Sequence, residues 1–272
     1  LAARVGTNVA AGDVNGDGVD EIITAPRDGG PYVRVFKKDG KAYGAGIWAF
    51  PRNARGSFDV AAGDVNGDGK DEIIVSKSEG KSTVKIFKYD AKKTLVKEFD
   101  ALGSINVGVR VAAGDVDNDG KAEVIVGAGK GGDAIVRVFE SNGKAKKIEF
   151  YAYAKGYRDG IDVAAGDTDG DGKAEIAVSK LGKQSLVKVF RYNKANKVLG
   201  EWTSYGAAAV GSYVAMGDID SDGKAEVVTI AAEGGAPYVR GYEKNGVFKK
   251  SLNFYAYGKN ARIGGDVAFG AF

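Results

Sequence analysis

The sequence predicts an all-β protein built from repeated four-stranded units, and three observations predict it. Of 272 residues, 42 are Gly and only four are Pro, a composition that suits short strands joined by tight turns. No amphipathic segment reaches the length of a helix. A nine-residue acidic stretch recurs five times at a nearly constant spacing, which is typical of a repeat architecture.

Each acidic stretch has the pattern of a loop that wraps a hard cation. The clearest copy runs from Asp115 to Glu123, with oxygen-bearing side chains at its first, third, fifth and ninth positions and Gly at the sixth. Alternate side chains turn inward in such a loop, Gly permits the sharp bend, and the seventh residue can add its carbonyl. A solvated acidic turn would explain one copy, but not a ninth-position Glu in all five. The sequence therefore predicts about five Ca²⁺ sites.

The predicted side-chain ligands stand at the first, third, fifth and ninth positions of the loops. In chain order they are Asp13, Asn15, Asp17 and Glu21; Asp64, Asn66, Asp68 and Glu72; Asp115, Asp117, Asp119 and Glu123; Asp167, Asp169, Asp171 and Glu175; and Asp218, Asp220, Asp222 and Glu226. The last three loops have Asp at the third position where the first two have Asn. This additional negative charge predicts that the last three loops bind calcium more tightly.

The residues around the loops exclude a helical calcium motif. An EF-hand loop ends with Glu at position twelve and is flanked by helices. Here position twelve is occupied in turn by Thr24, Val75, Val126, Val178 and Thr229. Small apolar runs such as Val-Ala-Ala-Gly precede the loops, and β-branched runs such as 73–75 follow them. Each loop is therefore expected at the tip of a β-hairpin.

The spacing of the loops defines the repeat. Their first Asp residues are 51, 51, 52 and 51 residues apart, and each unit contains four strand-like runs. A period near fifty with four strands per unit predicts a propeller or a linear array. We expect a single domain over residues 1–272, with repeats at approximately 8–58, 59–109, 110–161, 162–212 and 213–265.

The segment 266–272 begins a sixth unit, but Ala271-Phe272 replaces the acidic loop. Because this tail has lost its metal loop, we expect a closed five-bladed ring in which the terminal strand caps the ring beside the first blade. The units also alternate, since units one, three and five have Gly-rich loops before their third strand. In a ring of five, two odd units (five and one) would then be direct neighbours.

The loops and the surrounding Val-Ala-Ala-Gly-Asp and Lys-Ala-Glu-Val-Ile-Val phrases resemble the FG-GAP/VCBS repeats, which include the calcium-bearing blades of integrin α-subunit propellers. The resemblance covers nearly the whole chain. It implies a β-propeller, here all-β and five-bladed, in which the calcium loop joins the innermost strand of a blade to the second. It also implies that the seventh-position carbonyls complete the ligand sets, and these belong to Val19, Lys70, Lys121, Lys173 and Lys224.

Composition restricts the chemistry and the partners. The absence of Cys and His excludes disulfides, zinc sites of the usual kind and Ser-His-Asp catalysis. The formal net charge of +3 would become about +13 with five divalent cations bound, so the surface away from the loops is basic. We expect a protein or glycan ligand, with anionic ligands favoured. We expect no nucleic acid partner and no membrane insertion, because neither a recognition motif nor a segment of spanning length occurs.

Two features favour a location outside the cell. Open oxygen-ligand loops need the millimolar calcium found there, so we expect a secreted or cell-surface protein. The chain starts without an initiator Met or signal peptide, and we expect it to be part of a larger chain.

A second set of residues lies in the loops that follow the fourth strand of the odd units. Its basic members are Arg52, Arg55, Lys155, Arg158, Lys259 and Arg262. Arg beside an aromatic ring can bind a carboxylate, a sulfate or a sugar face. The alternative, which we favour, is that the arginines at 55, 158 and 262 brace their loops by pairing with Asp59, Asp162 and Asp266. The aromatic doublets Trp48/Phe50, Tyr151/Tyr153 and Tyr255/Tyr257 are expected to pack between blades rather than bind sugar.

These patterns predict a calcium-stabilised propeller that acts as a binding or structural module, of the adhesion type, within a larger extracellular protein. The alternative is a lectin that recognises acidic glycans through the odd-unit loops. A polysaccharide-degrading enzyme is the third hypothesis. We do not expect an enzyme, because every strong carboxylate cluster is already assigned to metal.

Overall fold

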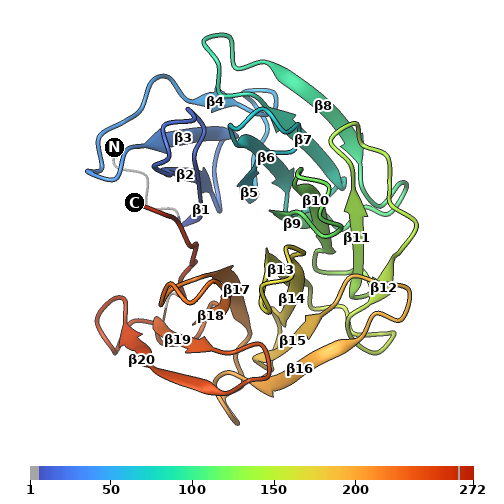
Figure 1. Ribbon diagram of the computed structural model, residues 1–272, viewed down its shortest axis with the longest axis vertical. Coiled ribbons are helices and arrows are strands. Elements are labelled where there is room, and N and C mark those ends of the chain that lie inside the picture. The colour runs from blue at the N-terminus through green and yellow to red at the C-terminus, as the bar shows by residue number, and fades with distance from the viewer. Residues whose placement is uncertain (1–5, 263) are drawn as a thin grey trace.

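The computed structural model describes residues 6–262 and 264–272 and contains five four-stranded antiparallel sheets arranged around a central axis (Figure 1). In every sheet the four strands are paired in chain order. The predicted five-bladed β-propeller is therefore confirmed. The described residues form no helix, so none of them provides a helical membrane span.

The strand bounds follow the predicted period. Blade 1 contains β1 (Thr7–Gly12), β2 (Glu21–Pro26), β3 (Tyr32–Phe36) and β4 (Ile47–Trp48). Blade 2 contains β5 (Phe58–Gly63), β6 (Glu72–Lys77), β7 (Thr83–Phe87) and β8 (Leu95–Asp100). Blade 3 contains β9 (Val109–Gly114), β10 (Glu123–Ala128), β11 (Ile135–Phe139) and β12 (Phe150–Tyr151). Blade 4 contains β13 (Ile161–Gly166), β14 (Glu175–Lys180), β15 (Leu186–Phe190) and β16 (Val198–Thr203). Blade 5 contains β17 (Ser212–Gly217), β18 (Glu226–Ala231), β19 (Tyr238–Tyr242) and β20 (Phe248–Tyr255).

The hydrophobic cores lie between blades, which explains the composition of each strand. All six residues of β10 are buried, because both faces of a blade are covered by its neighbours. Val124 and Val126 belong to the core shared with blade 2, and Ile125 belongs to the core shared with blade 4. The innermost strands carry small residues because they converge at the axis: a Cβ at Gly63 would lie only 2.7 Å from that of Ala113.

The C-terminal tail differs from its prediction. Residues 264–272 form no hydrogen-bonded strand, so the predicted terminal strand over 266–272 is wrong. The tail runs along the axis between β17 and β1 (Figure 1). Blade 5 and blade 1 are therefore not direct neighbours, and the predicted seam between two odd units is also wrong. The tail forms no strand because it has no second strand to pair with. It separates blade 5 from blade 1 because it fills an innermost position between them.

Candidate metal centres

The five acidic loops all join the first strand of a blade to the second, as predicted. The ninth-position Glu is the first residue of each second strand (β2, β6, β10, β14 and β18). Neighbouring loops are linked by backbone hydrogen bonds, in which the eighth residue of one loop donates to the first residue of the loop before it. Asp71 N donates to Asp13 O at 2.8 Å, and Ala174 N donates to Asp115 O at 2.7 Å. The loops thus form one connected series on a single face of the propeller.

The first Asp of each loop organises the backbone around its carboxylate. Asp13 Oδ1 accepts from Gly16 N at 2.6 Å, and Oδ2 accepts from Gly18 N at 2.7 Å. Burial opposes ionisation of Asp13, but these N–H groups outweigh it and lower the pKa of the carboxyl. The fourth and sixth positions of every loop have positive φ, which turns successive N–H groups toward this carboxylate. The sixth position is Gly in all five loops because this conformation strains other residues.

The ninth-position Glu is buried in all five loops. Burial raises the pKa of Glu21, Glu72, Glu123 and Glu175, so an ionised carboxylate there needs a cationic partner. In the first two loops, Oε2 of this Glu is buried without a hydrogen-bond partner among the described residues. The third-position amides of Asn15 and Asn66 donate to the other oxygen of the same Glu. The orphaned oxygens fit a bound cation.

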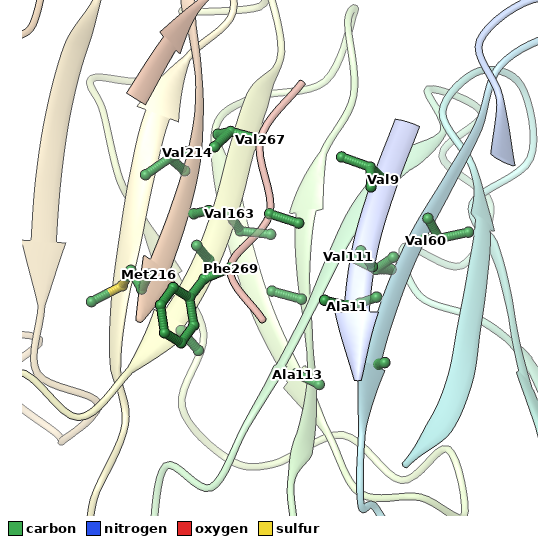
Figure 2. A pocket seen from close by; sticks show the side chains of 18 of the residues that line it. Val9, Ala11, Val60, Val111, Ala113, Val163, Val214, Met216, Val267 and Phe269 are labelled. Carbon is green, nitrogen blue, oxygen red and sulfur yellow. The ribbon is translucent and has the colours of Figure 1, made fainter. Parts of the chain in front are cut away.

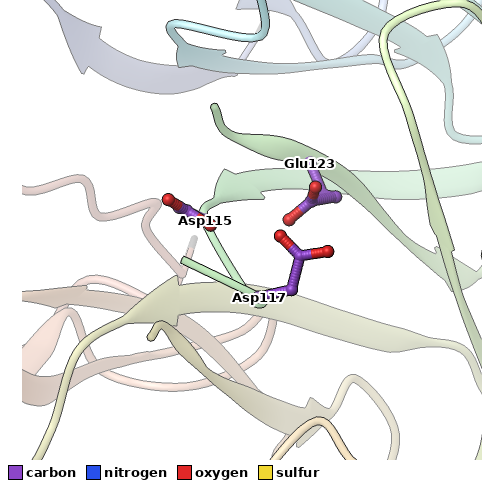
Figure 3. A group of neighbouring side chains, drawn as sticks. All are labelled: Asp115, Asp117 and Glu123. Atoms are coloured by element: carbon purple, nitrogen blue, oxygen red, sulfur yellow. The ribbon is translucent and has the colours of Figure 1, made fainter. Parts of the chain in front are cut away.

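The last three loops bring carboxylates together. Asp115, Asp117 and Glu123 offer oxygen atoms within 4.8 Å of one another (Figure 3), as do the equivalent residues of loops four and five. Those equivalents are Asp167, Asp169 and Glu175, and Asp218, Asp220 and Glu226. Three carboxylates at this separation repel one another strongly unless a positive charge lies between them. The chemistry of the donor set therefore fits Ca²⁺.

A basic side chain already reaches into four of the loops, a feature that the sequence reasoning missed. Lys146 Nζ lies 2.5 Å from Asp117, 2.9 Å from Glu123 and 3.0 Å from Glu140. Lys249 makes the equivalent contacts in loop five, Arg191 pairs with loop four, and Lys88 pairs with loop two. In the described part of the chain, no Lys or Arg pairs with the carboxylates of loop one, where Tyr43 replaces Lys146 in the aligned hairpin. Alignment of these hairpins is the signal that could have found them.

The arginines of the second predicted set brace their loops, but not through the expected acids. Arg55 Nη1 donates to the carbonyls of Arg52 and Ala54 at 2.8 and 2.7 Å, and Arg262 Nη1 makes the same two bonds in its loop. Arg158 Nε instead pairs with Asp133 at 3.1 Å. The predicted pairing with Asp59, Asp162 and Asp266 is therefore wrong. Those three acids lie on the innermost segments and point to the axis.

Two of the three aromatic doublets have one buried and one exposed member, whereas Tyr255 and Tyr257 are both exposed, so the expected packing is wrong for that doublet. Phe50 and Tyr153 are buried between blades, as predicted for packing residues. Trp48 and Tyr151 are almost half exposed, and the expectation that they pack in the interior is wrong for them. The Arg52 guanidinium lies 4.9 Å from the Trp48 ring, and Lys155 Nζ lies 5.3 Å from the Tyr151 ring. The odd blades thus present aromatic rings with a basic residue beside them.

A buried charged cluster near the axis also escaped the sequence reasoning. Arg110 Nη1 lies 2.9 Å from Asp59 Oδ1, and its Nη2 donates to Tyr213 Oη at 3.2 Å. Burial raises the pKa of Asp162 to about 8 and that of Asp266 to about 6, against the opposing attraction of nearby arginines. These five residues come from five different innermost segments, at equivalent repeat positions.

Comparison with known proteins supports the repeat family and the fold. Residues 13–75 and 115–178 match the family described as "FG-GAP-like repeat". No curated protein matches the chain.

Three solved structures share the fold. The exotype rhamnogalacturonan lyase YesX is 17% identical, with a TM-score of 0.50 over 86% of this chain and 49% of the lyase. A lectin of Agrocybe aegerita, solved for its recognition of non-reducing terminal N-acetylglucosamine, is 16% identical, with a TM-score of 0.50 over 90% of this chain and 65% of the lectin. Sqt1 of Chaetomium thermophilum is 12% identical, with a TM-score of 0.50 over 86% of this chain and 56% of Sqt1. The chain spans about half to two thirds of these proteins, and at such identities the similarity shows the fold alone.

Proposed function

Because this chain belongs to the FG-GAP-like repeat family, we propose that it is a calcium-stabilised propeller that serves as a binding module of a larger extracellular protein. The connected series of acidic loops on one face is the observation that carries this proposal. The family supports the assignment, because repeats of this type hold calcium between the first and second strands. A millimolar calcium supply, as outside cells, would suffice for loops of this open kind.

In the proposed sites, the protein residues hold the ion at the loop tips. The first-, third-, fifth- and ninth-position side chains would bind it, together with the seventh carbonyls. A bound cation would supply the positive charge that the buried Glu carboxylates lack. The loop-to-loop hydrogen bonds would let each ion stabilise the hairpins of two blades. Calcium would thus stiffen one face and leave the opposite face for ligands.

Calcium is expected to raise the melting temperature, and a chelator is expected to lower it. Binding to the folded state alone stabilises a protein by about 2.7 kcal/mol at a hundredfold excess over Kd, which corresponds to roughly 5–10 °C for a domain of this size. Differential scanning fluorimetry with chelator, then with calcium or equimolar magnesium added back, measures the effect. Magnesium should restore little, because it requires near-octahedral geometry. An identical melting curve in chelator, with calcium and with magnesium would exclude metal-stabilised loops.

A second candidate function, glycan binding, is favoured by the exposed aromatic rings of the odd blades. The Trp48 ring packs against Tyr32 at an interplanar angle of 40° with ring centroids 4.7 Å apart, and the Arg52 guanidinium lies 4.9 Å from the Trp48 ring. Tyr255 and Tyr238 form a similar pair at 4.5 Å. A flat aromatic face beside a guanidinium is suited to a sugar ring with an acidic substituent.

Replacing Trp48 with Ala is expected to weaken binding to an acidic oligosaccharide about fivefold, because about 1 kcal/mol of stacking and charge interaction would be lost. Glycan-array binding followed by calorimetry on the best acidic glycan measures this loss. Leu95→Ala is the matched control, since Leu95 is equally exposed but lies in an even blade. If the two variants bind the glycan with equal affinity, the exposed aromatic residues of the odd blades do not form the binding site.

We propose binding rather than catalysis, because the carboxylate clusters among the described residues already have other assignments. Most lie in or beside the loops assigned to metal, and the axial acids Asp59 and Asp266 pair with arginines. Two of the structural relatives above are a lyase and a lectin, so turnover of anionic polysaccharides is the assay that separates these classes. Product formation that is lost when a single residue of this chain is replaced would show that the protein is an enzyme.

A further inference from the structure

The C-terminal tail occupies a sixth position in the innermost ring. Each innermost strand packs its last Gly against the penultimate residue of the next innermost strand, as Gly63 does against Ala113. Gly217 of blade 5 packs in the same way against Phe269 of the tail, and Gly270 of the tail packs against Ala11 of blade 1. Figure 2 shows the tail, with Val267 and Phe269, lying between the strands that carry Val214 and Val9. The ring therefore has six sectors, although only five contain a complete blade.

The hydrogen bonds of the tail repeat those of the even blades. Val111 N donates to Asp59 of blade 2 at 2.8 Å, and Val214 N donates to Asp162 of blade 4 at 2.9 Å. Val9 N donates to Asp266 of the tail at 2.9 Å. The odd blades have Asn8, Arg110 or Tyr213 where these acids stand. Because Asp266 takes the place of Asp59 and Asp162, the tail corresponds to the innermost strand of an even-type unit. Odd-type and even-type units therefore alternate around all six sectors.

The same closure is visible at the loop face. Asp71 N of loop two donates to Asp13 O, and Asp20 N of loop one donates to Ala271 O, both at 2.8 Å. Ala271 thus takes the place of the first residue of a sixth loop. The sixth sector is built on its inner side, but it lacks the three outer strands that every other sector has.

The face of blade 5 toward this sector is apolar and open. Phe254 is 50% exposed, whereas its equivalents Ile47 and Phe150 are 3% and 6% exposed. Tyr257 is 60% exposed, whereas Tyr153 is 6% exposed and donates its hydroxyl to the carbonyls of Val178 and Leu186 in the following even blade. A groove of about 370 Å³ runs along this face, lined by Leu252, Phe254, Tyr257 and the tail. In blades 1 and 3 the equivalent surface is covered by an even blade.

The face of blade 1 on the other side of the sector presents an unused donor. Arg137 of blade 3 donates to Ala101 O of blade 2 at 3.1 Å, and Arg240 of blade 5 donates to Ser204 O of blade 4 at 2.6 Å. Arg34 is the equivalent residue of blade 1. Its side chain is exposed and makes no hydrogen bond or ion pair within residues 6–262 and 264–272. On both edges of the sector, therefore, the exposed residues are those whose equivalents in the other odd blades contact an even blade.

We propose that the sixth sector is a docking site for the loop and three outer strands of an even-type FG-GAP-like repeat segment. This occupant would pair its first outer strand with the free edge of the tail. Its apolar face would cover Phe254, its backbone carbonyls would accept from the Tyr257 hydroxyl, and the carbonyl after its last strand would accept from Arg34. The docking surface on this chain contains none of the proposed calcium ligands and neither of the aromatic pairs proposed for glycan binding.

The test joins such a segment to the chain. Residues 64–105, the loop and outer strands of blade 2, are fused after Gly270 in place of the last two residues. We expect the melting temperature to rise by about 5 °C, the fluorescence of a bound apolar dye to fall severalfold, and the added segment to resist a protease. An unchanged melting temperature with rapid cleavage of the added segment would overturn the proposal, because a covalent fusion removes the entropic cost of association.

Matched variants assign the effect to the surface. Phe254→Asp in the groove and Arg34→Ala on blade 1 should abolish or reduce the gain, whereas Val247→Asp, in the exposed β19–β20 turn, should leave it intact. A gain that survives Phe254→Asp would overturn the docking geometry. Sedimentation of the unextended chain tests the other occupant, a second copy. Dimers that Phe254→Asp dissociates would assign the surface to self-association and overturn the proposal.

Discussion

Replacing Arg110 with Met is expected to lower the free energy of unfolding by about 3–5 kcal/mol at pH 8, and the melting temperature by on the order of 10 °C. Arg110 is buried and pairs with Asp59 at 2.9 Å. Its positive charge also acts on Asp162 and Asp266 across the axis. Without it, three acids face one another in a buried site, and within the described residues the remaining ion pair is that of Arg27 with Asp266, at 3.7 Å.

The pH dependence of this loss follows from the acids. Burial raises the pKa of Asp162 to about 8 and of Asp266 to about 6, both above the ordinary value of 3.8. From about pH 4 to pH 8 the folded state binds more protons than the unfolded state. The free energy of unfolding therefore falls as the pH rises through this range. Losing Arg110 removes an attraction that favours the charged carboxylates and therefore steepens this fall. The destabilisation should be smaller at pH 5 than at pH 8.

Chemical denaturation at the two pH values measures both effects. Arg158→Met is the matched control, because Arg158 lies in the same repeat unit but forms an exposed pair with Asp133, and such pairs contribute at most about 1 kcal/mol. Adding Asp162→Asn to the Arg110 variant should recover part of the loss at pH 8, because one buried carboxylate is removed. Equal losses at pH 5 and pH 8 would mean that Arg110 acts through packing alone.

Much of the fold could be predicted because its determinants are local. The ligand spacing from Asp115 to Glu123, the Gly at the sixth position and the β-branched run that follows fix a hairpin within one unit. Because the pattern repeats in every unit, the same hairpin is predicted in each of the five blades. Strand existence, strand order and the position of each acidic loop follow from these short-range patterns.

The remaining features depend on contacts between units, which no local pattern encodes. Arg110 meets Asp59 across 51 residues of sequence, and Val9 meets Asp266 across 257. The partner of Arg158 is Asp133 on the neighbouring loop, not the acid four residues away. Ring closure depends on the angles between all neighbouring blades. The absence of a metal loop in the tail therefore could not predict that the tail occupies a sixth innermost position.

The calcium affinity of loop three is expected to rise at least about tenfold when Lys146 is replaced by Met, equivalent to about 1.4 kcal/mol. The Lys146 ammonium lies within 3.0 Å of oxygen atoms on Asp117, Glu123 and Glu140. These contacts raise the pKa of Lys146 against the opposing effect of burial, so it stays charged where a cation would bind. Calcium must displace this ammonium before it reaches the two loop carboxylates.

This competition predicts an affinity order different from the one predicted from charge alone. Loops three to five have one more carboxylate than the first two, but each holds a Lys or Arg among its ligands. Loop one has no such competitor within the described residues and keeps an orphaned Glu21 oxygen. We therefore expect loop one to fill first in the unaltered protein.

Calorimetric titration with calcium, with melting temperatures measured in chelator, tests this competition. In Lys146→Met the metal-free protein should melt lower, because three carboxylates lose their counter-charge, and the calcium-dependent rise should be larger. Lys147→Met is the matched control, since the neighbouring Lys147 is exposed and makes no ion pair within the described residues. A lower calcium affinity in Lys146→Met would show that the ammonium holds the carboxylates in place for the ion. An unchanged affinity would show that calcium binds loop three without contacting Asp117 and Glu123, because any ion between those carboxylates must replace the ammonium.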